Sequence, residues 1–160
     1  MSRASTIRLV RREEFIQVRE AIRGSYFLAK HSWPKPLCEM AYDGLSQGKW
    51  IGYGCFSECE ELMSYLDYKE KMSGEIEVGI CLTQERYKGR GLMKLMLKFL
   101  IARYPDQEIT IGTYDKNAGM ICCISSVGFE EELKIPDDRI DGSTSIHYRR
   151  IPGKLITKGI

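Results

Sequence analysis

Six consecutive residues, 86–91, carry the clearest chemical pattern in the chain, Arg-Tyr-Lys-Gly-Arg-Gly. Gly89 and Gly91 allow backbone conformations that expose consecutive N–H groups. A helix is predicted to begin directly after them, and the dipole at a helix N-terminus favours an anion. With three basic side chains beside it, the stretch predicts a cradle for a pyrophosphate. A turn that only caps a helix, with its basic residues in solvent, shows the same pattern, so both interpretations stay open at this point.

Two familiar nucleotide-binding loops do not account for this stretch. A Walker A loop ends in Gly-Lys-Ser or Gly-Lys-Thr, which is absent here, and Lys94 stands where a dinucleotide-binding loop has its third glycine. A phosphate-binding domain for a nucleotide such as ATP is therefore kept only as an alternative hypothesis.

Cysteines are the other reactive side chains of note. The chain has six cysteines and two histidines, and no cysteine pair has the spacing of a zinc knuckle. We therefore expect no metal site, and we expect reduced cysteines that pack as small apolar residues. They are Cys38, Cys55, Cys59, Cys81, Cys122 and Cys123.

The elements that must position the glycine-bearing stretch are a strand before it and a helix after it. Residues 75–82 alternate, which predicts a strand with Ile76, Val78, Ile80 and Leu82 on one face. A helix is predicted over 91–103, a strand over 108–113, and a helix over 117–127 that Asn117 caps and Gly128 ends. Further strands are expected at 6–10, 50–56, 62–68 and 143–150, and further helices at 12–22 and 37–45.

This order of elements predicts the fold class. A strand, a helix and a second strand in the middle of the chain call for a right-handed crossover between parallel strands. The flanking strands read as hairpins. Together they predict an α/β fold of the mixed α+β kind, with a mostly antiparallel sheet and helices on both faces.

Length and composition set limits on function. With 160 residues, 43% hydrophobic and 29% charged, we expect one globular domain over 1–160, with 151–160 as a tail. A net charge of +2 does not favour nucleic acid as a partner. Lys94 and Lys98 interrupt the longest apolar stretch, so no membrane span is expected. No signal peptide is recognised, and a cytoplasmic location is expected.

The stretch also resembles a known family. The pattern Gln/Arg-x-x-Gly-x-Gly/Ala after a long strand is the signature of the GNAT (Gcn5-related N-acetyltransferase) superfamily, and residues 86–91 match each fixed position. A second family element is an asparagine that opens the next helix and is followed by Gly-Phe, which Asn117 and Gly128-Phe129 match. The resemblance is firm over 75–129 and topological elsewhere.

The resemblance implies a GNAT fold that binds acetyl-CoA as cosubstrate. The strands 75–82 and 108–113 would splay apart, and the pantetheine arm would pair with the first of them. Asn117 would contact the cofactor from the other side, and no metal is needed. The implied cofactor-binding residues are Gly79, Ile80, Cys81, Arg86, Tyr87, Lys88, Gly89, Arg90, Gly91, Leu92 and Asn117.

The resemblance also implies catalytic groups. Amide formation needs a neutral amine, so a base must remove a proton from a group whose pKa is about 10.4 in lysine. Glu75 lies where the family often has a glutamate and is the first candidate base, with Glu77 in reserve, although both could be solvated on the sheet. A tyrosine is usual at the position of Ile124, which cannot donate a proton. Cys123, Ser125, Ser126 or water would then replace it.

The acceptor site is expected over the loop between the first two helices. Its aromatic residues Tyr26 and Trp33 are the candidate substrate-binding residues, and a lid that only closes the core is the alternative. The resemblance implies transfer of an acetyl group to a primary amine, on a small molecule or a protein, by direct attack in a ternary complex. A non-catalytic acyl-CoA sensor or protein-interaction module is the alternative. A homodimer is expected by analogy.

Overall fold

The computed structural model describes residues 5–25, 36–139 and 141–153. Its centre is one seven-stranded sheet in the order β1-β2-β3-β4-β5-β7-β6, in which only β4 and β5 run parallel. The mixed, mostly antiparallel sheet is therefore confirmed. The strands are β1 (Thr6–Leu9), β2 (Ile51–Phe56), β3 (Leu62–Glu70), β4 (Ile76–Thr83), β5 (Ile109–Tyr114), β6 (Glu130–Ile135) and β7 (Ser145–Arg150).

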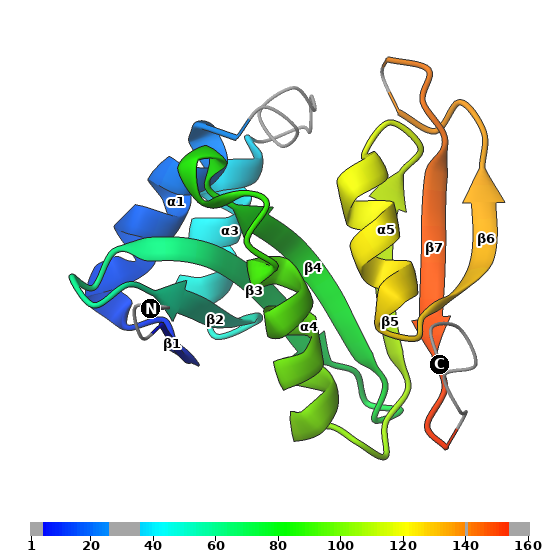
Figure 1. Cartoon of the computed structure of the whole chain (residues 1–160), viewed down its shortest axis with the longest axis horizontal. Coiled ribbons are helices and arrows are strands. Elements are labelled where there is room, and N and C mark those ends of the chain that lie inside the picture. Colours follow the sequence, from blue (N-terminus) through cyan, green and yellow to red (C-terminus); the bar gives the residue numbers. More distant parts are fainter. Residues whose placement is uncertain (1–4, 26–35, 140, 154–160) are drawn as a thin grey trace.

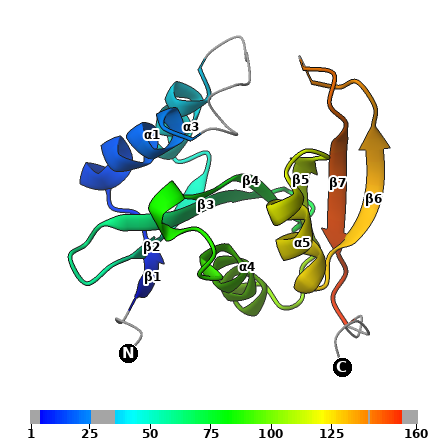
Figure 2. The same cartoon turned by 45° about the horizontal axis from the view of Figure 1, so that its top comes forward.

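Helices cover both faces of the sheet, as expected. They are α1 (Phe15–Arg23), α3 (Leu37–Ser46), α4 (Leu92–Arg103) and α5 (Ala118–Ser126), with 3₁₀ turns η1 (Arg12–Glu14) and η2 (Glu85–Tyr87). Figure 2 shows α1 and α3 on one side of the sheet and α4 and α5 on the other. Each side has its own apolar core, because the sheet separates the two helix pairs. No helix in the described part of the chain has the length and apolar character needed to cross a membrane.

The sheet opens between its two central strands. β4 pairs with β5 only through Ile76 with Ile109 and Glu77 with Thr110. Beyond these residues the strands diverge, and Figure 1 shows them close together at one end and wide apart at the other. Within the described residues, the rest of β4 therefore has no strand partner on the β5 side. This confirms the predicted splay.

A β-bulge in β4 changes which side chains face each helix layer. Leu66 lies opposite Cys81 and Tyr68 opposite Val78, so Asp67 alone faces both Gly79 and Ile80. One extra residue in a strand reverses the alternation that follows it. The prediction that four alternating side chains share one face is therefore wrong. Ile76 and Val78 pack with α4 and α5, whereas Ile80 and Leu82 pack with α1 and α3.

Strand β6 was not expected from the sequence. Its residues read Glu-Glu-Glu-Leu-Lys-Ile, and all but the last are exposed. It lies at the edge of the sheet, where one neighbour, β7, supplies its hydrogen bonds. An exposed edge strand has no apolar face to bury, so it lacks the alternation that reveals other strands.

Candidate active site

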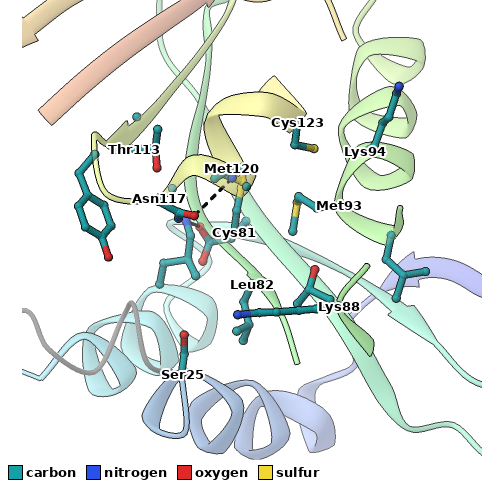
Figure 3. A pocket seen from close by; sticks show the side chains of 18 of the residues that line it. Ser25, Cys81, Leu82, Lys88, Met93, Lys94, Thr113, Asn117, Met120 and Cys123 are labelled. Carbon is teal, nitrogen blue, oxygen red and sulfur yellow. Dashed lines mark hydrogen bonds between the residues drawn. The ribbon is translucent and has the colours of Figure 1, made fainter. Parts of the chain in front are cut away.

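A cavity of about 960 Å³ lies along the opening between β4 and β5. This is within the ordinary size range of small-molecule sites, roughly 300–1,000 Å³. Its walls come from α3, β3, β4, the glycine turn, α4, β5, α5 and the loop between β6 and β7. Figure 3 shows Met93 of α4 and Cys123 of α5 directed into this space, with Asn117 at the start of α5.

The glycine turn forms one end of the cavity. Gly89 and Gly91 have φ values of +79° and +73°, a left-handed conformation that favours glycine, and Gly91 is the N-cap of α4. The lining residues of this segment are Tyr87, Lys88, Gly89, Gly91 and Leu92. The N-terminus of a twelve-residue helix therefore opens onto the cavity.

The other two basic residues of the turn lie elsewhere. The guanidinium carbons of Arg86 and Arg90 lie 5.1 and 5.2 Å from the centre of the Tyr87 ring, and neither residue lines the cavity. Arg86 also forms an ion pair with Glu61, which accepts a 2.5 Å hydrogen bond from the Tyr87 hydroxyl. Of the three cations, only Lys88 therefore lines the cavity.

Asn117 stands on the far side of the cavity from the glycine turn. Its Oδ1 accepts a hydrogen bond from the Met120 amide at 3.3 Å, which caps α5 as the sequence predicts (Figure 3). The residue also lines the cavity. Its capping role therefore places a side-chain amide at the wall opposite α4.

The bulged segment of β4 forms the floor. Gly79, Ile80 and Cys81 line the cavity, and Gly79 is exposed within it. A side chain at 79 would force a neighbour to move, because a Cβ there would overlap Asp67 Oδ1 and lie 2.7 Å from Trp50 Cζ3. Gly79 thus leaves strand backbone accessible beside a carboxylate and an aromatic ring.

Asp67 is the functional candidate that the sequence analysis missed. It lines the cavity although it is only 3% exposed. The Ile80 amide donates to its Oδ1 at 2.7 Å, and the Tyr65 hydroxyl donates to its Oδ2 at 2.8 Å. Burial raises the pKa of Asp67 to about 6, and these two hydrogen bonds oppose the rise. The sequence does contain a signal, because an aspartate in an otherwise largely apolar strand needs a reason to be buried.

The hydrogen bond to Asp67 also determines what the Ile80 N–H can do. A strand N–H that faced the cavity could stabilise a developing oxyanion. The Ile80 N–H instead donates to a carboxylate on the neighbouring strand. The bulge causes this, because it turns the amide toward β3.

The structure places the two predicted catalytic glutamates away from the cavity lining. Glu75 lies before β4, where Arg149 Nη1 and Lys71 Nζ approach its carboxylate to 3.1 and 3.3 Å. Burial raises the pKa of Glu75, but these hydrogen bonds together outweigh it and hold the pKa below its ordinary value. Glu77 pairs with Lys69 at 3.1 Å. Catalysis by either glutamate stays a prediction that these positions do not support.

The position where the family usually has a tyrosine is buried. Ile124 is 0% exposed and packs in the core between α4, α5 and the sheet. Of the three predicted replacements, Cys123 and Ser126 line the cavity and Ser125 does not. Burial raises the pKa of Cys123, an effect that Lys94 partly offsets, so its thiol stays protonated at neutral pH.

The predicted acceptor site includes residues outside the described ranges. Tyr26 and Trp33, the predicted substrate-binding residues, lie outside the described residues. The described walls on this side include Leu37, Met40 and Ala41 of α3, together with Trp50, Tyr114 and Arg139, none of which the sequence analysis singled out.

Comparison with known proteins identifies the family of the chain and relates its fold to solved structures. Residues 6–129 match the acetyltransferase (GNAT) family. No curated protein sequence gives a significant match. Among solved structures, the chain resembles the ribosomal-protein-S18-alanine N-acetyltransferase from Escherichia coli, with a TM-score of 0.75 and 13% identity over 98% of this chain and 99% of that chain.

Two further structures contain coenzyme A. The spermidine N-acetyltransferase from Vibrio cholerae, in complex with CoA and spermine, has a TM-score of 0.74 and 11% identity over 94% of this chain and 96% of that one. A ribosomal L7/L12 α-N-protein acetyltransferase in complex with CoA has a TM-score of 0.75 and 15% identity over the same shares. At these identities the likeness shows the fold, and the match over most of the sequence shows the family. The chain belongs to the acetyltransferase (GNAT) family.

Proposed function

We propose that this protein transfers an acetyl group from acetyl-CoA to a primary amine by direct attack in a ternary complex. One observation carries the proposal: a single cavity connects the N-terminus of α4, the open backbone of β4 and the buried carboxylate of Asp67. An anion site, a strand edge and a base are the three things that such a transfer needs from a protein.

The residues present fit coenzyme A. The turn at 87–92 and Lys88 would hold the pyrophosphate, because exposed amides and a helix N-terminus both favour an anion. Backbone groups of Gly79, Ile80 and Cys81, other than the Ile80 N–H that donates to Asp67, would pair with the pantetheine arm along the edge of β4. Asn117 would contact the arm from α5. The bound cosubstrate supplies the thioester whose acyl carbon the amine attacks.

Asp67 is the proposed base. An ammonium group must lose one proton before its nitrogen can attack, and Asp67 accepts that proton and passes it to solvent. A carboxylate of ordinary pKa is a poor base for this step, whereas the raised pKa of Asp67 brings it closer to the amine. The hydrogen bonds from Ile80 and Tyr65 hold its oxygens in place during the transfer.

The remaining atoms balance without a covalent enzyme intermediate. The acceptor nitrogen bonds to the acyl carbon while the carbon–sulfur bond breaks. The second nitrogen proton and the departing thiolate end as the CoA thiol. Burial raises the pKa of Cys81 and Cys123, which disfavours a nucleophilic thiolate at either position and supports direct transfer. Cys123, as a protonated thiol beside the buried Ile124, is the proposed relay: it donates its proton to the departing sulfur and regains the second nitrogen proton, so it ends as a thiol.

Burial of Ile124 also favours a second candidate, a module that binds acyl-CoA without turnover. Calorimetric titration with acetyl-CoA, with ATP as the control ligand, tests binding first. Release of CoA thiol is then followed with a panel of primary amines. Binding with amine-dependent release, lost in Asp67→Asn while acetyl-CoA still binds, supports the enzyme. Binding without release from any amine supports the module, and no binding overturns both.

A further inference from the structure

Asp67 faces the side of the sheet that carries α1 and α3. Its neighbours Leu66 and Tyr68 pack in the core with α4 and α5. Tyr65, whose hydroxyl donates to Asp67, packs in the core with α1 and α3. Side chains alternate between the two faces of a strand, so Asp67 shares the face of Tyr65. The proposed cofactor residues at the starts of α4 and α5 belong to the other side of the sheet (Figure 2), which leaves the carboxylate on the acceptor side.

The indole of Trp50 lies within reach of any ligand that contacts Asp67. Both side chains line the cavity, and Gly79 lies between them. A Cβ on Gly79 would overlap Asp67 Oδ1 and lie 2.7 Å from Trp50 Cζ3, so one methyl-sized position beside the exposed Gly79 touches both. An amine whose nitrogen reaches Asp67 therefore places its own carbon atoms against the edge of the indole.

Two glycines leave space for the Trp50 ring. At the end of the ring away from Gly79, a Cβ on Gly44 of α3 would lie 2.6 Å from Trp50 Cδ1. The indole thus spans from α3 to β4. Lys69 Nζ lies 4.9 Å from the centre of the ring, and Lys69 does not line the cavity. These contacts fix the indole before any ligand arrives, which lowers the entropy cost of binding.

Helix α3 continues this wall with apolar side chains. Ala41 and Met40 lie three and four residues before Gly44, and Leu37 lies one further turn back, so all of them share one face of the helix. Leu37, Met40 and Ala41 line the cavity together with Trp50, and we call these four residues the apolar track. The stretch of α3 from Leu37 to Gly44 spans about 10 Å. The track is therefore long enough for an extended apolar group.

The charges of this wall favour one ammonium group and no second. Asp67 is the one acidic side chain among the described lining residues. A charge that leaves water needs a partner of opposite sign. A second ammonium on the acceptor would find no carboxylate along the described track, and the ammonium of Lys69 already lies beside Trp50. The wall therefore complements a molecule with a single amine and an apolar body.

Building on the proposed function, we propose that the acceptor is a primary monoamine with an apolar body, such as an alkylamine. Its nitrogen reaches Asp67, its first carbon atoms contact the edge of Trp50, and the rest of its body lies along Leu37, Met40 and Ala41. Trp50 and Met40 then set specificity for the acceptor, whereas Asp67 takes the proton. A long acyl chain is the other apolar group that would fit the track, but it has no positive charge to place at the carboxylate.

The test compares amines that differ only in their bodies. Release of CoA thiol from acetyl-CoA is measured with ethylamine, butylamine, hexylamine and the diamine of the same chain length as hexylamine. We expect kcat/KM to rise with chain length, by up to about fourfold for each CH₂ group that is buried. We expect hexylamine to exceed the diamine by about tenfold or more, because the second charge has no partner on the track.

Met40→Glu should reverse the preference between hexylamine and the diamine. Met40 is 41% exposed and lines the cavity, so a glutamate there is tolerated and supplies the missing carboxylate. It should lower kcat/KM for hexylamine and raise it for the diamine, each by about tenfold. Ile16→Glu is the matched control, because Ile16 is 52% exposed on α1 and does not line the cavity. It should leave both amines unchanged.

Trp50→Phe tests the indole itself. The variant keeps an aromatic ring but loses part of the apolar contact, so KM for hexylamine should rise by about four- to tenfold. The value of kcat should change much less, as expected when a contact is made equally in the ground state and the transition state. The affinity for acetyl-CoA, measured by calorimetry, should be the same in all three variants.

The outcomes distinguish this inference from the proposed function. Equal kcat/KM for hexylamine and the diamine, no dependence on chain length, or equal effects of Met40→Glu and Ile16→Glu would overturn the acceptor assignment and leave the acetyltransferase proposal standing. A preference for longer acyl-CoAs, with ethylamine as good an acceptor as hexylamine, would assign the track to the acyl group and also overturn this inference. If acetyl-CoA binds and no amine releases CoA thiol, both proposals fall together.

Discussion

Asp67 Oδ1 accepts a 2.7 Å hydrogen bond from the Ile80 amide, across the bulge that interrupts β4. The contact links two strands at the point where the sheet begins to open. It holds a carboxylate at the floor of the cavity while keeping that carboxylate nearly out of solvent. The same bulge that reverses the faces of β4 therefore positions the proposed base.

Asp67→Asn should abolish most turnover and leave cofactor binding intact. The amide keeps an acceptor for the Ile80 N–H but cannot take a proton. We expect kcat to fall by about 10²–10⁴-fold, the usual contribution of a general base. Calorimetry should give an unchanged affinity for acetyl-CoA. Glu77→Gln serves as the control, because Glu77 lies outside the cavity lining, and equal losses in the two variants would contradict the assignment.

The pH dependence of the reaction should show Asp67 directly. Below its pKa of about 6 the carboxyl is protonated and cannot act as a base, so kcat/KM should fall as pH drops through this value. The profile should be measured with an amine whose own pKa lies well above this range, so that it stays an ammonium ion and needs the base at every pH. The acid limb should disappear in Asp67→Asn. An unchanged limb in that variant would assign it to another group.

The free energy of unfolding should also depend on the protonation of Asp67. It should fall as pH rises, whereas turnover should rise. Burial raises the pKa of Asp67 from 3.8 to about 6, so the folded protein holds the proton more tightly than the unfolded chain. This contribution is fully present below pH 3.8 and is lost as pH rises through about 6. Urea unfolding at a series of pH values should therefore show a decline over this window in the wild type. The decline should be weaker in Asp67→Asn.

Glu75 should prove structural rather than catalytic. Arg149 contacts Glu75, Glu108 and Glu132, and so ties together strands on both sides of the opening. Glu75→Gln should lower the free energy of unfolding by about 1.5 kcal/mol, the lower end of the range for a hydrogen bond to a charged group. Because the pKa of Glu75 is lowered, the contribution is present above its ordinary pKa and is lost as pH falls.

The activity of the same variant decides between the two roles of Glu75. The turnover of folded Glu75→Gln should stay within about threefold of wild type, whereas loss of a catalytic base costs at least about 100-fold. Glu77→Gln again provides the comparison for stability. Its ion pair with Lys69 is more exposed, so the cost should be below about 1 kcal/mol.

Gly79→Ala should disturb the site, because Gly79 lies at the floor of the cavity. The new methyl group would overlap Asp67 Oδ1 and crowd Trp50, so one of them must move. We expect a loss of stability of about 1–3 kcal/mol from overpacking. Turnover should fall more than acetyl-CoA affinity. Gly24→Ala is the control, since its Cβ would lie 3.5 Å or more from other atoms and Gly24 does not line the cavity.

Local sequence determined most of the elements and the backbone at the proposed cofactor end of the site. Glycines at 89 and 91 adopt the left-handed conformations that their residue type favours, and Asn117 caps α5. These features depend on neighbours along the chain, which is why composition and spacing reveal them. The exposed edge strand β6 escaped prediction because a strand without a buried face leaves no alternation.

Which leucines of α4 are buried cannot be predicted from the sequence of the helix alone. Leu95 and Leu97 are both leucines of the predicted helix 91–103, yet Leu95 is 45% exposed whereas Leu97 is fully buried. The sheet on one side and α5 on another select the buried positions, and neither is encoded in the helix itself.

Only the tertiary structure brings together the residues of the proposed chemistry. Asp67 and Gly79 meet because β3 and β4 pair in a register that contains a bulge, and Trp50 lies beside them because Gly44 of α3 and Gly79 leave space for its ring. Pairing register and helix packing depend on contacts between residues far apart in the chain. The sequence by itself therefore determined the family and the glycine turn at the proposed phosphate-binding end of the site. The fold determined which carboxylate is buried beside the open strand, and hence the proposed base.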